Sequence, residues 1–335
     1  KGNFDNDLLP SIVNNFKKDV IQDAETYSGR ANMLMRAFTS KIDWRDQVAY
    51  VNDIQKITKK DIVDFANKYF GDNYVAVYKK KGERTDVEKI EKPAITPVET
   101  NAGKQSEFVK QIQAMPSTPV APVFLDYNKD MQKGKLGKAE VLYVQNKDND
   151  LFRLNFRYKM GSLNDLKMAV AAQYIQFLGT DKKSAEQISK EFYKIASSFR
   201  VTTNEEYTYV TIEGLQENFQ AAVALYEDLV LHVKVDEQAL QSLKARIAKY
   251  RGDVKANRNQ IMQALTSYAL YGPKNKYNHA LSNAQLEATT AEELVDRIKK
   301  LNEVEQTIIY YGPASLKQLT QKLDKLHKVP TEFAQ

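Results

Sequence analysis

The feature of this sequence that most constrains its fold is a helix-and-strand module that occurs twice. Thr58–Asp64 (TKKDIVD) matches Thr290–Asp296 (TAEELVD) residue class by residue class. Each copy opens with a threonine followed three residues later by an acid, which is the capping signature of a helix start. A loop, a β-rich run and a glycine follow, over 74–82 in the first copy and 307–312 in the second. The repeat indicates that the chain holds the end of one αβ unit and the whole of a second.

A Pro-rich stretch separates the two copies. From Glu83 to about Val123 any regular element is interrupted by Pro93, Pro97, Pro116, Pro119 and Pro122, with room for one short helix over 106–112. We therefore predict the end of a preceding αβ domain over 1–85, a linker over 86–123 and a complete αβ domain over 124–335. The alternative is that the two copies arose by chance, since capping boxes are frequent.

The clearest single element is a strand over 152–160. Its apolar residues Phe152, Leu154, Phe156, Tyr158 and Met160 alternate with polar ones, as one buried face of a strand requires. Weaker patterns predict strands over 74–78, 139–144, 207–212 and 307–311. Helical spacing predicts helices over 8–16, 31–38, 57–70, 166–178, 184–195, 217–230, 236–255, 261–265 and 290–296. The class is α+β, with an antiparallel or mixed sheet packed with helices.

Composition excludes several classes of site. The chain lacks Cys, which rules out disulfides, thiolate catalysis and Cys-based zinc sites. The net charge of +6 is spread along the sequence, so a nucleic-acid-binding stripe is not expected. No window approaches the roughly 18 consecutive apolar residues of a membrane helix. Because the chain begins with Lys1 and not Met, we expect it to lie inside a longer protein.

Catalytic motifs are also missing. The three histidines, His232, His279 and His327, show no H-x-x-x-H spacing, so we expect surface or helix-end positions and not metal ligation. The sequence contains neither a G-x-S-x-G elbow nor a phosphate-binding glycine loop.

The order of elements in the second unit resembles a known family. A strand, Gly161-Ser162, an apolar helix, Gly179-Thr180, a capped helix, a strand and then 214–219 (GLQENF) look like the first domain of one half of the insulinase/pitrilysin zinc metallopeptidases. The resemblance implies a two-layer αβ roll of the mitochondrial-processing-peptidase-like metallohydrolase type. It also implies that 1–85 is the tail of that family's second domain and 124–335 its inactive third domain.

Active members of this family carry H-x-x-E-H on the helix before the Gly-Thr pair. The two histidines lie on one helical face and bind zinc, and the Glu acts as general base. Counted back from Gly179, the corresponding positions here are Val170, Gln173 and Tyr174. None of them supplies the required group, because Val170 has no lone pair, Tyr174 is a poor ligand near neutral pH and Gln173 does not take up a proton.

The third ligand of the family is an acid on a later helix, which corresponds here to 236–255. The middle of that stretch, 243–251 (LKARIAKYR), is basic, and positive charge repels a metal ion. We therefore expect no catalytic or metal-binding residue in this chain. The resemblance places zinc in a catalytic domain of the parent protein outside this chain.

The resemblance implies a non-catalytic part of a zinc-dependent metalloendopeptidase. It would form a chamber wall that binds peptide or unfolded substrate and contacts the other domains of the same parent chain, with no nucleic acid and no membrane span. The alternative is a scaffold or interaction module of a family member without proteolytic activity. An H-x-x-E-H upstream of this chain would distinguish the two. Periplasmic or secreted placement is slightly favoured over cytoplasmic, because Cys is absent.

Overall fold

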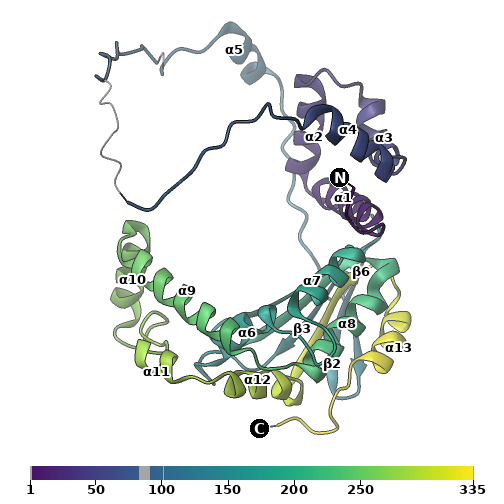
Figure 1. The fold of residues 1–335 in the computed structure, drawn as a ribbon, viewed down its shortest axis with the longest axis vertical. Coiled ribbons are helices and arrows are strands. Elements are labelled where there is room, and N and C mark those ends of the chain that lie inside the picture. Colours follow the sequence, from purple (N-terminus) through teal and green to yellow (C-terminus); the bar gives the residue numbers. More distant parts are fainter. Residues whose placement is uncertain (1, 83–90, 101, 335) are drawn as a thin grey trace. The chain divides into compact units, whose positions relative to one another are not determined.

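The computed structural model describes residues 2–82, 91–100 and 102–334 (Figure 1). The chain forms two compact units, one made of residues 1–64 together with 126–335 and the other of residues 65–125. The predicted boundaries at 85 and 123 stay predictions. No helix in the described ranges is long and apolar enough to span a lipid bilayer.

The second of these units contains the predicted short helix. Helix α5 spans Glu107–Ala114 and begins at Ser106, whose hydroxyl accepts a hydrogen bond from the Val109 amide at 3.2 Å. The remaining described residues of the Pro-rich stretch form no regular element, as repeated prolines require. Residues 83–90 and 101 of the predicted linker lie outside the described residues.

The N-terminal residues form helices, as their apolar spacing predicts. The predicted ones are α1 (Leu8–Glu25), α2 (Tyr27–Thr39) and α4 (Lys59–Tyr69), whereas α3 (Trp44–Ile54) was not predicted. At the start of α4 the predicted capping box is present, because the Thr58 amide donates to the Asp61 carboxylate at 2.8 Å and the Asp61 amide donates to the Thr58 hydroxyl at 3.2 Å. Helix α1 packs against the C-terminal part of its unit, where the Asn15 side chain donates to the Tyr193 carbonyl at 2.8 Å.

The predicted strand over 74–78 is wrong. These residues have no strand structure, and the side chains of Tyr74, Val75, Val77 and Tyr78 are exposed. A strand is maintained by a hydrogen-bonded partner, and this segment pairs with none in the described part of the chain. The first copy of the repeated module therefore has its capped helix but not its strand.

The C-terminal part of the first unit is built on a mixed sheet of six strands in the order β1-β2-β6-β3-β5-β4. The strands are β1 (Gln132–Leu136), β2 (Ala139–Gln145), β3 (Leu151–Tyr158), β4 (Ser198–Thr203), β5 (Thr208–Leu215) and β6 (Gln306–Gly312). Strands β2 and β6 run parallel, and the other neighbours are antiparallel. The second copy of the module supplies β6 at the centre of the sheet, so its predicted strand is confirmed.

The predictions missed both edge strands. In β1 only Leu136 is buried, and in β4 only Val201 is buried. An edge strand shares fewer packing contacts than a central one, so its sequence carries little apolar alternation. Strand β3 is central and keeps the predicted alternation, with Phe152, Leu154, Phe156 and Tyr158 buried.

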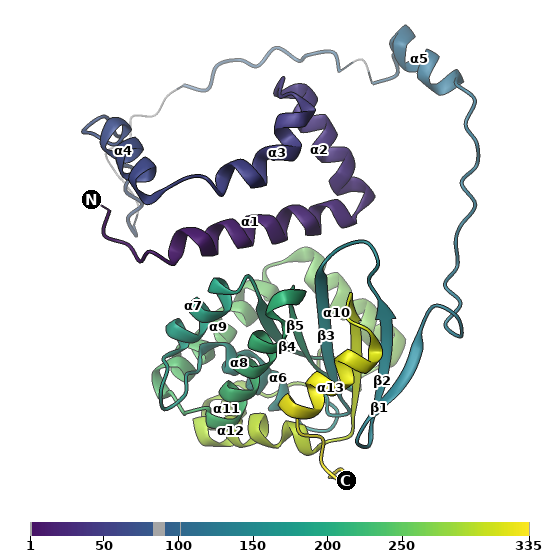
Figure 2. The same cartoon turned by 90° about the vertical axis from the view of Figure 1, so that its right-hand side faces the viewer.

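Helices cover one face of this sheet (Figures 1 and 2). The helices of this part of the chain are α6 (Met168–Tyr174), α7 (Ala185–Lys194), α8 (Phe219–His232), α9 (Glu237–Lys255), α10 (Arg258–Tyr271), α11 (Asn283–Ala288), α12 (Ala291–Lys300) and α13 (Leu316–Leu326). Of these, α10 packs on α9 and not on the sheet. Helices α11 and α13 were not predicted. The repeated capping box opens α12, where the Glu293 amide donates to the Thr290 hydroxyl at 3.3 Å. The architecture is the predicted α+β class with helices layered on a mixed sheet.

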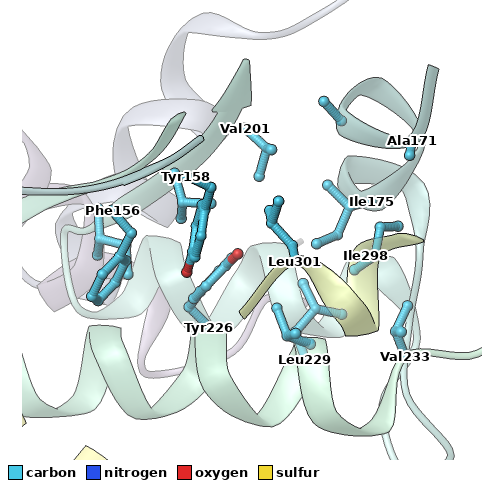
Figure 3. Packing of buried hydrophobic residues seen from close by; sticks show 14 of the residues in the cluster. Phe156, Tyr158, Ala171, Ile175, Val201, Tyr226, Leu229, Val233, Ile298 and Leu301 are labelled. Carbon is cyan, nitrogen blue, oxygen red and sulfur yellow. The ribbon is translucent and has the colours of Figure 1, made fainter. Parts of the chain in front are cut away.

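The core lies between the sheet and these helices. Figure 3 shows Tyr158 of β3 beside Tyr226 of α8, with Ile175 and Leu301 in the same cluster. Both tyrosines are buried, and the Tyr158 hydroxyl donates to the Asn302 side chain at 2.5 Å. Burial raises the pKa of Tyr158 and of Tyr226 well above the ordinary value of 10.0, and the nearby Glu227 carboxylate adds to this rise.

We predict an alkaline loss of stability from these two tyrosines. Their pKa is higher in the folded than in the unfolded state, so their contribution is complete below pH of about 10 and is lost as pH rises above it. Tyr158→Phe should lower stability by about 1 kcal/mol at pH 7 but make the decline above pH 10 less steep. Urea unfolding at several pH values measures this. Tyr250→Phe, at an exposed position, should keep the wild-type slope.

Candidate functional site

The three family-motif positions lie together on α6. Val170 and Tyr174 are one helical turn apart and buried, and Gln173 is exposed. The apolar run that predicts this helix supplies its buried face, because Met168, Ala171 and Ala172 pack into the core. A short 3-10 turn over Ile175–Phe177 ends the helix before Gly179. The three positions thus lie within one helix, which is shorter than the predicted 166–178.

The Tyr174 hydroxyl is fully engaged by the start of α9. It donates to the Asp236 carbonyl at 2.7 Å and accepts from the Asp236 amide at 2.9 Å. Burial raises the pKa of this hydroxyl, with smaller contributions from neighbouring acids. Zinc prefers an anionic or imidazole ligand, and a tyrosine held protonated is neither. The side chain instead links α6 to α9 by these two hydrogen bonds.

The other two positions are equally unsuited to zinc. Val170 has only an aliphatic side chain, and Gln173 donates from Nε2 to the Ala169 carbonyl at 3.2 Å. In the described ranges no group of three or more His, Asp or Glu side chains is placed to hold a metal ion. The residues at the motif positions therefore do not fit the zinc site that the family's active members contain.

Helix α9 faces α6 with cationic side chains where the family's third ligand is an acid. Arg246 and Arg251 line the cavity between the two helices. The Arg246 guanidinium lies over the Phe177 ring, 4.8 Å from its centroid, and Arg251 donates to the Leu281 carbonyl at 2.8 Å and to the Asn283 side chain. Lys244 points elsewhere and donates to the Glu287 carbonyl at 2.7 Å. The basic character predicted for this helix is therefore present at the cavity.

This cavity has a volume of about 560 Å³. Its apolar wall comes from Leu166, Ala169 and Val170 on one side and Ile247 and Leu281 on the other. Among the described residues that line it there is no Asp or Glu. A site lined by fixed positive charge and apolar surface attracts anions and disfavours cations.

A second cavity of about 1100 Å³ adjoins the first, since both are lined by Ser162 and His279. The Nε2 atom of His279 donates to the Ser162 carbonyl at 3.0 Å. The second cavity carries both charges, from Glu205 and Glu206 on the β4–β5 connection and from Lys274 and Lys276 on the α10–α11 connection. Sequence reasoning assigned no role to His279, and its spacing in the sequence contains no signal of this position.

The two remaining histidines line neither of these cavities. His232 ends α8, where it is exposed and bonds to the Asp228 side chain at 2.9 Å. His327 follows α13 but is buried, with Nδ1 2.8 Å from the Glu227 carboxylate and Nε2 2.8 Å from the Gln306 side chain. Both are helix-end residues, as predicted.

Comparison with known proteins connects this domain with a peptidase family. Residues 158–292 match the family described as insulinase (peptidase family M16). A curated relative, an uncharacterized zinc protease of Bacillus subtilis named YmxG, is 28% identical over 109 residues, which cover 32% of this chain and 25% of the relative.

Solved structures share the fold. A peptidase M16 inactive domain from Pseudomonas fluorescens aligns with a TM-score of 0.52 and 15% identity, over 61% of this chain and 52% of that one. The periplasmic protease PqqL of Escherichia coli aligns with a TM-score of 0.51 and 12% identity, over 88% of this chain and 33% of that one. The chain thus spans a quarter of the curated relative and a third to a half of these structures.

Proposed function

The chain carries an αβ domain of the insulinase family, peptidase family M16, of the inactive-domain type, and on this premise we propose that it is a non-catalytic portion of a zinc-dependent metalloendopeptidase. Val170, Gln173 and Tyr174 occupy the positions of the zinc motif, and residues 124–335 form the inactive domain. Residues 1–85 are the end of the preceding domain and 86–123 the linker. Hydrolysis takes place at a zinc site elsewhere in the parent protein.

One observation supports this proposal above the others. Tyr174, at the position of the second histidine, is buried and uses its hydroxyl twice on the backbone of Asp236. Placing a metal ion there requires breaking both bonds and exposing a charged group to the core, at a cost of several kcal/mol. The position therefore serves the packing of α6 on α9, and the chemistry of a metallopeptidase is not available to it.

The part that the domain plays in the parent is to bind substrate and hold the parent's domains together. The cavities beside α6 and α9 are open and lined by both apolar and charged groups, which suits contact with an extended polypeptide. We propose that 124–335 forms one wall of a substrate chamber. A periplasmic or secreted location is in keeping with the fold neighbour PqqL, a periplasmic protease.

A scaffold without proteolytic partner domains is the second candidate. The residues at the zinc-motif positions are compatible with this candidate too, because a family member that has lost catalysis in all its domains keeps the fold without the zinc ligands. The parent's upstream sequence distinguishes the two candidates. An H-x-x-E-H motif followed by a ligand acid supports the peptidase, and its absence supports the scaffold.

Metal analysis and a cleavage assay test the non-catalytic assignment. The 335-residue chain, dialysed against zinc and then against buffer, should retain far less than one zinc per chain and should leave unfolded casein intact. Plasma mass spectrometry gives the metal content, and the active parent protein serves as the positive control for cleavage. One zinc per chain, or metal-dependent cleavage by the chain itself, would refute the proposal.

A further inference from the structure

We propose that the cavity between α6 and α9 binds the carboxylate of a peptide, with Arg246 and Arg251 as its partners. This inference rests on the function proposed above and specifies the substrate group that the domain recognises. Val170 and Gln173, at two of the three motif positions, line this cavity together with the two arginines.

The arginines of the cavity have no carboxylate partner within ion-pair distance among the described residues, although Arg246 also lines a neighbouring pocket with Glu186 and Asp236. In the described part of the chain neither Arg246 nor Arg251 forms an ion pair, and no acidic side chain lines the cavity. Both of the hydrogen bonds found for Arg251 go to neutral oxygens, those of Leu281 and Asn283. A guanidinium has five N–H donors, so donors remain for a ligand.

The two arginines are held in place before any ligand arrives. The bonds to Leu281 and Asn283 fix Arg251, and the Phe177 ring supports Arg246 by stacking. A guanidinium that is already positioned loses little conformational entropy when it binds a carboxylate through two parallel hydrogen bonds. Two other cations of α9 are engaged elsewhere, since Lys249 pairs with Asp253 at 2.6 Å and Lys244 bonds to a backbone carbonyl.

The shape and lining of the cavity favour a peptide over a small inorganic anion. Its walls include Leu166, Val170, Ile247 and Leu281, which bury apolar side chains of a ligand. It continues at Ser162 and His279 into the larger cavity, so an extended chain has room beyond the carboxylate. The larger cavity carries both charges, from Glu205 and Glu206 and from Lys274 and Lys276, whereas the smaller one carries arginines and no acid. The smaller cavity is therefore the one that selects for a carboxylate.

Binding of matched peptides to the 335-residue chain tests this site. The probes are a short Ala/Leu peptide with a neutral coumarin label and a free C-terminal carboxylate, its C-terminal amide, and an amide with one internal Glu. We expect the amide without Glu to bind about tenfold more weakly than the free acid in fluorescence anisotropy, as expected for loss of a charge-assisted bond. Strong binding of the Glu-containing amide assigns the site to acidic side chains, and strong binding of the free acid alone assigns it to the chain terminus.

Variants on α9 connect the effect to the arginines. Arg246→Gln should weaken binding of the free-acid peptide about tenfold and leave binding of the amide peptide unchanged. Arg251→Gln should also weaken binding of the free acid. Lys249→Gln removes the same charge from the same helix, outside the cavity, and should bind like the wild type. Arg246 is exposed, so its variant keeps the wild-type fold even if Arg251→Gln loses the Leu281 contact. Thermal unfolding of each variant checks this.

Three results overturn the carboxylate site. They are equal binding of acid and amide, equal weakening by Arg246→Gln and Lys249→Gln, and displacement of the peptide by an equimolar amount of inorganic phosphate. Each of these leaves the non-catalytic assignment intact, because that assignment depends on metal content and cleavage. Conversely, zinc bound to the wild-type chain refutes the assignment whatever the peptides do.

Discussion

Replacing His327 by Ala is expected to lower the free energy of unfolding by about 3 kcal/mol. The imidazole is 1% exposed, lies between Glu227 and Gln306 and stacks on Phe156 with ring centroids 4.1 Å apart. Its loss removes both hydrogen bonds, leaves two polar side chains without that partner and opens a cavity. The Gln306 amide nitrogen already has no hydrogen-bond acceptor among the described residues, so this cluster has little capacity to compensate.

Urea unfolding followed by circular dichroism measures the effect. His232→Ala is the matched control, because His232 ends α8 with its side chain 49% exposed, and its loss should change stability by less than about 0.5 kcal/mol. His327→Phe keeps an aromatic ring against Phe156 and separates the stacking from the hydrogen bonds. If His327→Ala were as mild as His232→Ala, the buried network between α13 and α8 would not contribute to stability.

Replacing Gly161 by Ala is expected to cost about 3 kcal/mol and to disturb the cavities. A methyl group at this position would lie 2.3 Å from the Glu205 carbonyl oxygen and 2.5 Å from the carbonyl carbons of Glu205 and Glu206. These are backbone atoms of the connection between β4 and β5. That connection must therefore move away from the connection between β3 and α6, which contains Gly161. Separation breaks the bonds from the Ser162 amide to the Asn204 carbonyl and from the Leu163 amide to the Glu205 carbonyl, both 2.9 Å.

The matched control for this variant is Gly252→Ala. Gly252 lies in α9 with nothing within 4 Å of the added carbon, and alanine is the better helix former, so stability should rise by about 0.5–1 kcal/mol. Thermal unfolding of both variants gives the comparison. If the Gly161→Ala protein were as stable as the wild type, the connection that contains Ser162 and the connection that contains Glu205 would move apart at no cost in free energy.

Under the proposed function, the residues at the motif positions and the arginines of α9 follow from one change. A domain that no longer binds a metal does not need acidic and imidazole groups in the cleft, and positive charge there does not compete with an ion. Tyr174 then has a structural role, since its hydroxyl bonds α6 to the start of α9. Arg246 and Arg251 give the cavity its positive charge.

Local patterns in the sequence predicted those elements whose cause is local. The alternation of β3 was readable because one of its faces is buried along its length, and the caps of α4, α7 and α12 were readable because a threonine or serine bonds the amide three residues on. The same reasoning failed for 74–78. There the β-rich run is present, but the described residues offer it no strand to pair with.

Alone, the sequence determined the α+β class, the capped helices and the central strands, because these follow from residue type and spacing within a few positions. Only the tertiary structure decided that His327 is buried between α8 and β6, and that Arg246, Arg251 and His279 meet α6 at one cavity. The partners of these residues are separated from them by tens of residues. Packing of the helices on the sheet brings them together, and no local pattern records such a contact.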